Sequence, residues 1–168
     1  MRTGTQSRGT VIDMVEIRQV DPDCDGARLC VSAYFVELNE RSPVPFNPAT
    51  GISAEPRELR PPEGALLVAY RREEPVGCGA VKHHVGAPSE IKRMWVSPTA
   101  RGVGLGRRML HELEQIAVAS GATIARLETN ENLVEAINLY RSAGYLEVPA
   151  FNDEPFAHHW FEKLLAVD

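Results

Sequence analysis

The sequence predicts a single domain of mixed α/β class, and three observations support this prediction. Short apolar segments alternate or run continuously as β-strands do, and longer segments repeat their apolar residues at helical spacing. A glycine-rich turn joins one strand to one helix. The 168 residues can bury a substantial core, and the hydrophobic fraction of 43% and charged fraction of 24% are ordinary for a globular protein.

The N-terminal part predicts a strand, a helix and a long loop. Residues 11–18 alternate as a strand does. Aspartates that can cap a helix precede a segment from about Ala27 to Asn39, whose expected buried stripe is Leu29, Cys30, Ala33 and Val36. Six prolines between residues 40 and 63 forbid a long helix or a central strand and leave room for a short helix around 54–59.

The remainder alternates strands with two helices. Six strands are expected, over residues 65–71, 76–82, 90–96, 123–129, 145–151 and 157–164. The longer helix starts at Gly104 and ends near Gly121, a residue suited to the position after a helix. The shorter helix begins near Asn132 and is closed by Gly144.

The segment Glu90–Gly106 contains the most specific pattern. A strand and a Ser-Pro turn lead into Arg-x-x-Gly-x-Gly, formed by Arg101, Gly104 and Gly106, at the start of the longer helix. The first N–H groups of a helix have no intrahelical partner, the helix dipole favours negative charge there, and glycine lets the backbone approach an anion closely. The turn therefore predicts a phosphate or diphosphate site, with Arg101 as an added positive charge.

Other phosphate-binding motifs do not fit this turn. A dinucleotide fingerprint needs a third glycine where the chain has Arg107 or Met109, and a Walker loop needs Gly-Lys-Ser/Thr where Gly106 precedes two arginines. The pattern instead resembles the acyl-CoA-binding motif of the GNAT acetyltransferase superfamily, with a plain glycine-rich turn as the alternative. A second GNAT signature, Ala-x-x-x-Tyr-x-x-x-Gly-Tyr, is matched by Ala136, Tyr140, Gly144 and Tyr145.

The resemblance covers nearly the whole chain. It implies a GNAT-like fold, in which about four helices flank a central, mostly antiparallel sheet of about seven strands. It also implies a cytoplasmic N-acetyltransferase that transfers the acetyl group of acetyl-CoA to a small-molecule amine by direct attack in a ternary complex. Protein lysine or N-terminal acetylation and a non-catalytic acyl-CoA-binding module stay as alternatives. Residues 1–10 are expected to form a disordered tail and residues 11–168 the acetyltransferase domain.

The resemblance also assigns roles to residues. The residues expected to bind CoA are Met94, Trp95, Val96, Arg101, Gly102, Val103, Gly104, Leu105, Gly106, Arg107 and Asn132. An amine with a pKa near ~10 is mostly ammonium at neutral pH and needs a base before it attacks a thioester. Glu90 is the expected base, on one strand face with Lys92, Met94 and Val96. Tyr140 is the expected acid for the CoA thiolate, and the Val96 N–H the expected oxyanion donor.

Each of these assignments has a structural alternative. Glu90 could be a solvated carboxylate paired with Lys92, and Tyr140 a packing residue of the helix. Asn132 with Glu135 three residues later also fits an N-cap with a reciprocal glutamate, and Asn130 competes for either role.

Composition limits the other partners. A net charge of −5 argues against nucleic acid and anionic membranes, since both call for basic surfaces. Three cysteines without metal or redox spacing suggest a reduced, cytosolic setting, and no apolar run is long enough to span a membrane. The adjacent histidines 83–84 and 158–159 face opposite sides of a strand, so no metal site is expected. The sequence does not decide whether the chain forms a homodimer.

Overall fold

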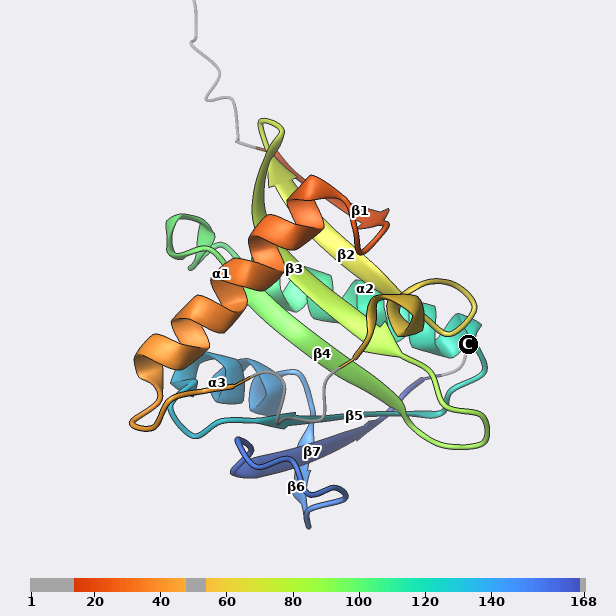
Figure 1. Ribbon diagram of the computed structural model, residues 1–168. Coiled ribbons are helices and arrows are strands. Elements are labelled where there is room, and N and C mark those ends of the chain that lie inside the picture. The colour runs from red at the N-terminus through yellow and green to blue at the C-terminus, as the bar shows by residue number, and fades with distance from the viewer. Residues whose placement is uncertain (1–13, 48–53, 167–168) are drawn as a thin grey trace, which may run out of the picture.

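One seven-stranded sheet, in the order β1-β2-β3-β4-β5-β7-β6, organises the computed structural model of the chain, which describes residues 14–47 and 54–166 (Figure 1). Its strands are β1 (Val15–Val20), β2 (Gly64–Arg71), β3 (Glu74–Lys82), β4 (Ser89–Val96), β5 (Ile124–Thr129), β6 (Leu146–Val148) and β7 (His159–Leu164). The helices are α1 (Asp25–Arg41), η2 (Pro56–Leu59), η3 (Pro98–Ala100), α2 (Leu105–Ala119) and α3 (Val134–Ser142), where η denotes a 3-10 helix. All strand pairs within these residues are antiparallel except β4 with β5. The predicted mixed α/β fold is confirmed.

The number of helices differs slightly from the four expected. Three α-helices lie within the described ranges, because the short helix predicted around residues 54–59 is the 3-10 helix η2. Pro56 lies in the first turn of η2, where a missing N–H costs little, and prolines at 61 and 62 prevent its continuation. The tail expected over residues 1–10 lies outside the described residues.

Helices α1 and α2 cover opposite faces of the central strands (Figure 1). In β2, Leu66 and Val68 belong to the core beneath α1, while Leu67 and Ala69 belong to the core beneath α2. A strand buried on both faces needs an uninterrupted apolar run, and β2 has one. Helix α3 packs into the same core as α2 through the buried Ile137.

The buried face of helix α1 differs in part from the predicted stripe. Cys30 is buried as predicted, but Leu29 and Val36 are 61% and 54% exposed, and Ala27 and Leu38 are buried in their place. Both sets contain residues at helical spacing, so periodicity could not separate them. The Cys30 thiol donates a 3.4 Å hydrogen bond to the carbonyl of Gly77 in β3, so the helix lies close to the sheet. Small residues on the inner face allow this approach.

A β-bulge interrupts β4 at Arg93. Trp95 and Lys92 are three residues apart in β4, but their partners in β3 are only two apart, so one residue of β3 lies opposite two of β4. Arg93 has a left-handed φ of 55°. That conformation costs a non-glycine residue about 1–2 kcal/mol.

Because of the bulge, the prediction that Glu90 and Lys92 share a strand face with Met94 and Val96 is wrong. A regular strand would place all four side chains on one face. The extra residue reverses the alternation, so Met94 and Val96 pack into the core beneath α2. Lys92 lies on the same face as Trp95, which packs into the core beneath α1.

Strands β4 and β5 are paired over a short stretch only. Their register joins Ser89 with Ala125 and Glu90 with Arg126, and the two strands then diverge (Figure 1). Beyond Glu90, the edge of β4 that faces β5 has no strand partner among the described residues. An open edge of this kind is able to pair with an extended ligand.

Candidate active site

Two adjoining cavities lie where β4 and β5 diverge. The cradle cavity lies between the start of α2, the end of β4, α1 and α3. The aromatic cavity lies between α1, the middle of β4, the end of β5 and the segments around Phe46 and Phe156. The residues that line both cavities are Tyr34, Leu38, Met94, Leu133, Ala136 and Tyr140.

The cradle cavity brings together most of the residues predicted to bind a diphosphate-bearing ligand. These are Met94, Trp95, Val96, Arg101, Gly102, Gly104, Leu105, Gly106 and Arg107. Gly102 and Gly104 have left-handed φ values of 81° and 79°, and nothing lies within 4 Å of the position a Cβ would take. The turn therefore presents bare backbone to the cavity. Val103 is 72% exposed, and neither Val103 nor Asn132 lines this cavity.

Arg101 makes specific contacts that the sequence did not indicate. Its guanidinium donates to both carboxylate oxygens of Glu37 in α1, at 2.7 and 2.9 Å, and to the Val96 carbonyl at 2.9 Å. The carboxylate of Glu37 therefore neutralises the Arg101 charge that was expected to attract the anion. Arg101 thus joins α1 to the end of β4, and anion binding by the backbone N–H groups at the start of α2 stays a prediction.

The Val96 N–H is directed toward the open edge of β4. The next residue, Ser97, donates its N–H to the Val76 carbonyl of β3 at 2.8 Å. Hydrogen bonding alternates along an antiparallel strand, so the N–H and carbonyl of Val96 point away from β3. The hydrogen bond from Arg101 to the Val96 carbonyl agrees with this direction. The expected oxyanion role of the Val96 N–H stays a prediction.

Glu90 is buried in a cluster of charges. Its carboxylate accepts a 2.8 Å hydrogen bond from Arg126 and lies 3.3 Å from Lys92 Nζ and 3.0 Å from His84 Nε2. Burial acts to raise the pKa of Glu90, but the hydrogen bond from Arg126 and the charges of Lys92, Arg126 and His84 outweigh it and lower the pKa below 4.5. Glu90 lines neither cavity, and its role as a base stays a prediction.

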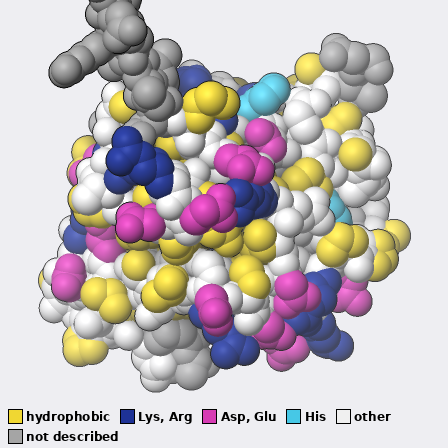
Figure 2. Space-filling model, turned by 90° about the horizontal axis from the view of Figure 1, so that it is seen from above, with side chains coloured by type: hydrophobic (Ala, Val, Ile, Leu, Met, Phe, Trp, Pro, Cys, Tyr) yellow, Lys and Arg dark blue, Asp and Glu magenta, His cyan; other side chains and the backbone are white. Residues whose placement is uncertain are grey.

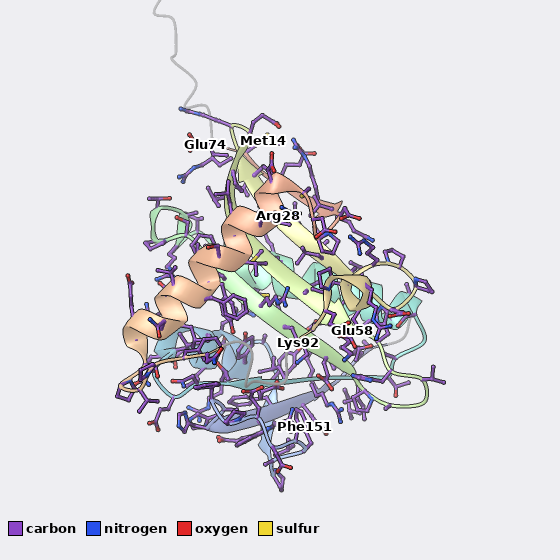
Figure 3. All side chains as sticks on the ribbon, viewed as in Figure 1. Met14, Arg28, Glu58, Glu74, Lys92 and Phe151 are labelled. Atoms are coloured by element: carbon purple, nitrogen blue, oxygen red, sulfur yellow. The ribbon has the colours of Figure 1, made fainter. Side chains whose placement is uncertain are left out.

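Glu128 of β5 lines the aromatic cavity and was missed from the sequence. Its Oε1 lies 3.4 Å from Lys92 Nζ, so Lys92, labelled in Figure 3, bridges Glu128 and Glu90. Burial raises the pKa of Glu128 above 4.5, and the charge of Glu90 adds to this effect while Lys92 opposes it. Arg126 and Glu128 are the two charged residues of β5 and are two residues apart on one strand face, and this pattern was the signal available for Glu128.

Two tyrosines lie at the junction of the cavities. Tyr140 projects from α3 and Tyr34 from α1, and each lines both cavities. Burial raises the pKa of both phenols above 10.0, so both stay protonated, as a proton donor requires. Tyr140 was expected from the second signature. Tyr34 was missed because the buried stripe predicted for α1 did not include it.

Three phenylalanines form one wall of the aromatic cavity. Phe35 and Phe46 stack with ring centroids 5.6 Å apart, and Phe46 meets Phe156 edge to face at 4.3 Å. They come from α1, the segment after it and the segment before β7. Glu154 also lines this cavity.

The predicted capping role of Asn132 is wrong. Helix α3 begins at Val134, and Leu133 is its N-cap residue. Asn132 instead donates its backbone and side-chain N–H groups to the Asn130 side chain, at 2.9 and 2.8 Å. The expected reciprocal partner, Glu135, pairs with Arg41. Asn130 lines the aromatic cavity and organises this turn.

The described residues contain neither a group of three potential metal ligands nor a helix that is long and apolar enough to cross a membrane. His158 accepts a hydrogen bond from the Glu131 N–H, and His159 pairs with Glu147. On the face seen in Figure 2, basic and acidic side chains lie next to one another instead of forming a field of one sign.

Known proteins are similar to this chain in sequence and in fold. The model of the acetyltransferase (GNAT) family matches residues 31–145. An uncharacterized N-acetyltransferase of Schizosaccharomyces pombe is 33% identical over 148 residues, which are 84% of this chain and 88% of that protein. The IAA acetyltransferase of Azospirillum brasilense is 42% identical over 90 residues, which are 53% of this chain and 59% of that protein. A Klebsiella pneumoniae structure described as an acyl-CoA N-acyltransferase has a TM-score of 0.75 and 26% identity, over 92% of this chain and 99% of that one.

The charge cluster around Glu90 predicts a pH-dependent contribution to stability. Because the pKa of Glu90 is lowered by folding, its ion pairs stabilise the fold above the unfolded pKa and lose this effect as pH falls through the folded pKa. We expect Glu90→Gln to lower the free energy of unfolding at pH 7 by about 1–3 kcal/mol. Urea denaturation should show this difference shrinking below about pH 4.5.

Glu16 supplies the matched control. It pairs with Arg18 at 2.8 Å but is 64% exposed, so Glu16→Gln should change stability little at any pH. An equal loss in Glu90→Gln at pH 7 and at pH 4 would contradict the coupling between Glu90 ionisation and folding.

Proposed function

This chain belongs to the GNAT acetyltransferase family, and we propose that it transfers an acetyl group from acetyl-CoA to an amine of a small molecule within a single N-acetyltransferase domain. One observation carries the proposal: the cradle cavity and the aromatic cavity meet at Tyr34 and Tyr140. The first offers an anion-binding turn and an open strand edge, and the second offers a buried carboxylate. Two substrates can therefore meet at the junction.

The cradle cavity suits CoA. The N–H groups of residues 103–107 would receive the diphosphate at the start of α2. The open edge of β4 at Met94 and Val96 would pair with the amide groups of the pantetheine arm, as an added strand does. This placement directs the thioester toward the junction, where the Val96 N–H is available to its carbonyl oxygen.

Direct transfer requires no covalent intermediate on the enzyme. The amine nitrogen forms a bond to the thioester carbon, the carbon–sulfur bond breaks, and the amine proton passes to a carboxylate. The departing thiolate takes a proton from Tyr140. Glu90, Lys92 and Glu128 form the charge network that would accept the amine proton.

Release of free CoA thiol tests this function. The purified chain should release thiol from acetyl-CoA when an acceptor amine is present, and mass spectrometry should find the acetylated amine. Binding of acetyl-CoA without transfer to any amine would overturn the proposal in favour of a non-catalytic binding module.

The cradle predicts a strong effect of negative charge at Gly104. Gly104→Asp should weaken acetyl-CoA binding, measured by calorimetry, by tenfold or more, which is about 1.4 kcal/mol or more. Gly104→Ala introduces the same backbone strain without charge, since a Cβ there meets nothing within 4 Å. The difference between the two variants isolates the anion site.

Gly121 offers a second control at the far end of α2. It has a φ of 96° and equally open surroundings, so Gly121→Asp should cost stability but leave acetyl-CoA affinity unchanged. Native affinity in a folded Gly104→Asp protein would rule out the cradle as the diphosphate site.

Removing the Tyr140 hydroxyl should slow acetyl transfer without disturbing the packing of the ring. Tyr140→Phe keeps the ring among Tyr145 and Phe161 and removes only the hydroxyl. We expect single-turnover acetyl transfer to slow by about 10²-fold, with a change in unfolding free energy near 1 kcal/mol. Tyr34→Phe is the comparison at the same junction. A native rate in Tyr140→Phe together with a slow rate in Tyr34→Phe would assign the acid role to Tyr34.

A further inference from the structure

We propose that the aromatic cavity selects primary amines with a flat apolar body, and that Glu128 holds the amino group and receives its proton. This inference rests on the proposed acetyl transfer and specifies its acceptor. Its support comes from the wall of the cavity, from the hydrogen bonding of Glu128 and from the arrangement of charges around Lys92.

The wall of the cavity suits an apolar acceptor. Phe35, Phe46 and Phe156 form a continuous aromatic surface, with centroid distances of 5.6 and 4.3 Å between neighbours. Further apolar side chains line the same cavity: Leu38, Ala54, Leu133 and Ala157. A flat apolar body gains by leaving water for such a wall, and an aromatic ring gains further from edge or offset contacts with it.

Glu128 is the carboxylate best placed for the amino group. Its side chain is 11% exposed, and its Oε1 lies 3.4 Å from Lys92 Nζ. Its Oε2 is buried and has no hydrogen-bond partner among the described residues. A buried carboxylate oxygen without a donor is costly, so a bound ammonium or amine N–H supplies what Oε2 lacks.

Neighbouring charges favour a cation beside Glu128. Lys92 is shared between Glu128 and Glu90, so it compensates neither carboxylate alone. Glu154 faces the same cavity, and burial together with Glu90 and Glu154 raises the pKa of Glu128. The other cation of the cavity, Arg93, donates to the Ala54 carbonyl at 2.6 Å and lies over the Phe35 ring.

The same contacts give Glu90 a positioning role. Glu90 lines neither cavity but pairs with Lys92, and Lys92 in turn pairs with Glu128 and orients it. As the amine nitrogen bonds to the thioester carbon and the carbon–sulfur bond breaks, the departing amine proton moves to Glu128 Oε2. The products are a neutral amide and, after protonation of the thiolate, free CoA.

A panel of amines tests the acceptor class. We expect kcat/KM to be at least tenfold higher for 2-phenylethylamine and tryptamine than for histamine, putrescine, an amino sugar or a lysine peptide. Histamine keeps the ethylamine arm of 2-phenylethylamine but replaces the apolar ring with a polar one. Faster transfer to putrescine, the amino sugar or the peptide would overturn the inference while leaving acetyl transfer intact. Failure with every amine, despite acetyl-CoA binding, would overturn the proposed function and the inference together.

Two isosteric variants test the carboxylates. Glu128→Gln should lower kcat/KM by about 10²–10⁴-fold at neutral pH and weaken the calorimetric binding of 2-phenylethylamine to the CoA-loaded enzyme, with acetyl-CoA affinity unchanged. The Glu128→Gln variant should also lose the acidic limb of the pH–rate profile. The charged or titratable groups near Glu128 that can also affect this profile are Tyr34, Tyr140, Lys92, Glu90 and Glu154. Glu112→Gln, at an exposed position of α2, is the control.

Glu90→Gln should retain a Glu128-dependent pH profile and lose less activity than Glu128→Gln. Because the ionised Glu128 carboxylate is destabilised by burial, Glu128→Gln should unfold no more easily than the native protein at neutral pH. Native kcat/KM in Glu128→Gln together with loss of activity in Glu90→Gln would make Glu90 the base and overturn the assignment.

Discussion

The arrangement of the site depends on the divergence of β4 from β5 after Glu90. Parallel pairing stops there, and three residues further along β4 the bulge at Arg93 bends the strand and reverses its alternation. Both cavities occupy the space that this divergence leaves. The strain at Arg93 is offset by contacts of the same residue, since its side chain reaches the Ala54 carbonyl and its own carbonyl accepts from the Cys78 thiol.

The charged residues between the two strands alternate in sign toward the aromatic cavity. Arg126 binds Glu90, Glu90 binds Lys92, and Lys92 binds Glu128. Each inner member has an opposite charge on both sides, which offsets the cost of burying it. Glu128 ends this series at the aromatic cavity, with Lys92 as its one neighbour in the series and with its Oε2 lacking a hydrogen-bond partner among the described residues.

Helix α1 contributes residues to both the cradle cavity and the aromatic cavity. Tyr34 and Leu38 reach both cavities, Phe35 belongs to the aromatic wall, and Glu37 holds Arg101. Through Arg101, the same helix is tied to the end of β4. The arginine of the motif therefore contributes to the shape of the predicted anion site, where the backbone N–H groups at the start of α2 and Arg107 are also present.

The sequence by itself determined the order of the strands and most of their positions, the two glycine-bounded helices, the glycine turn before α2 and the choice of Tyr140 as a residue of the cleft, because each depends on local chemistry. The bounds of β1 and β6 differ from those predicted. Glycines at 102 and 104 permit positive φ, and apolar runs of period 2 or 3.6 form strands and helices wherever they lie. Tertiary structure alone decided what depends on contacts between distant segments. The inner face of α1, the pairing of Arg101 with Glu37 and the joining of Glu90 to Glu128 through Lys92 all involve residues far apart in the chain. The bulge in β4 also changed which side chains share a strand face. A bulge of this kind cannot be predicted from the period-2 alternation of the sequence.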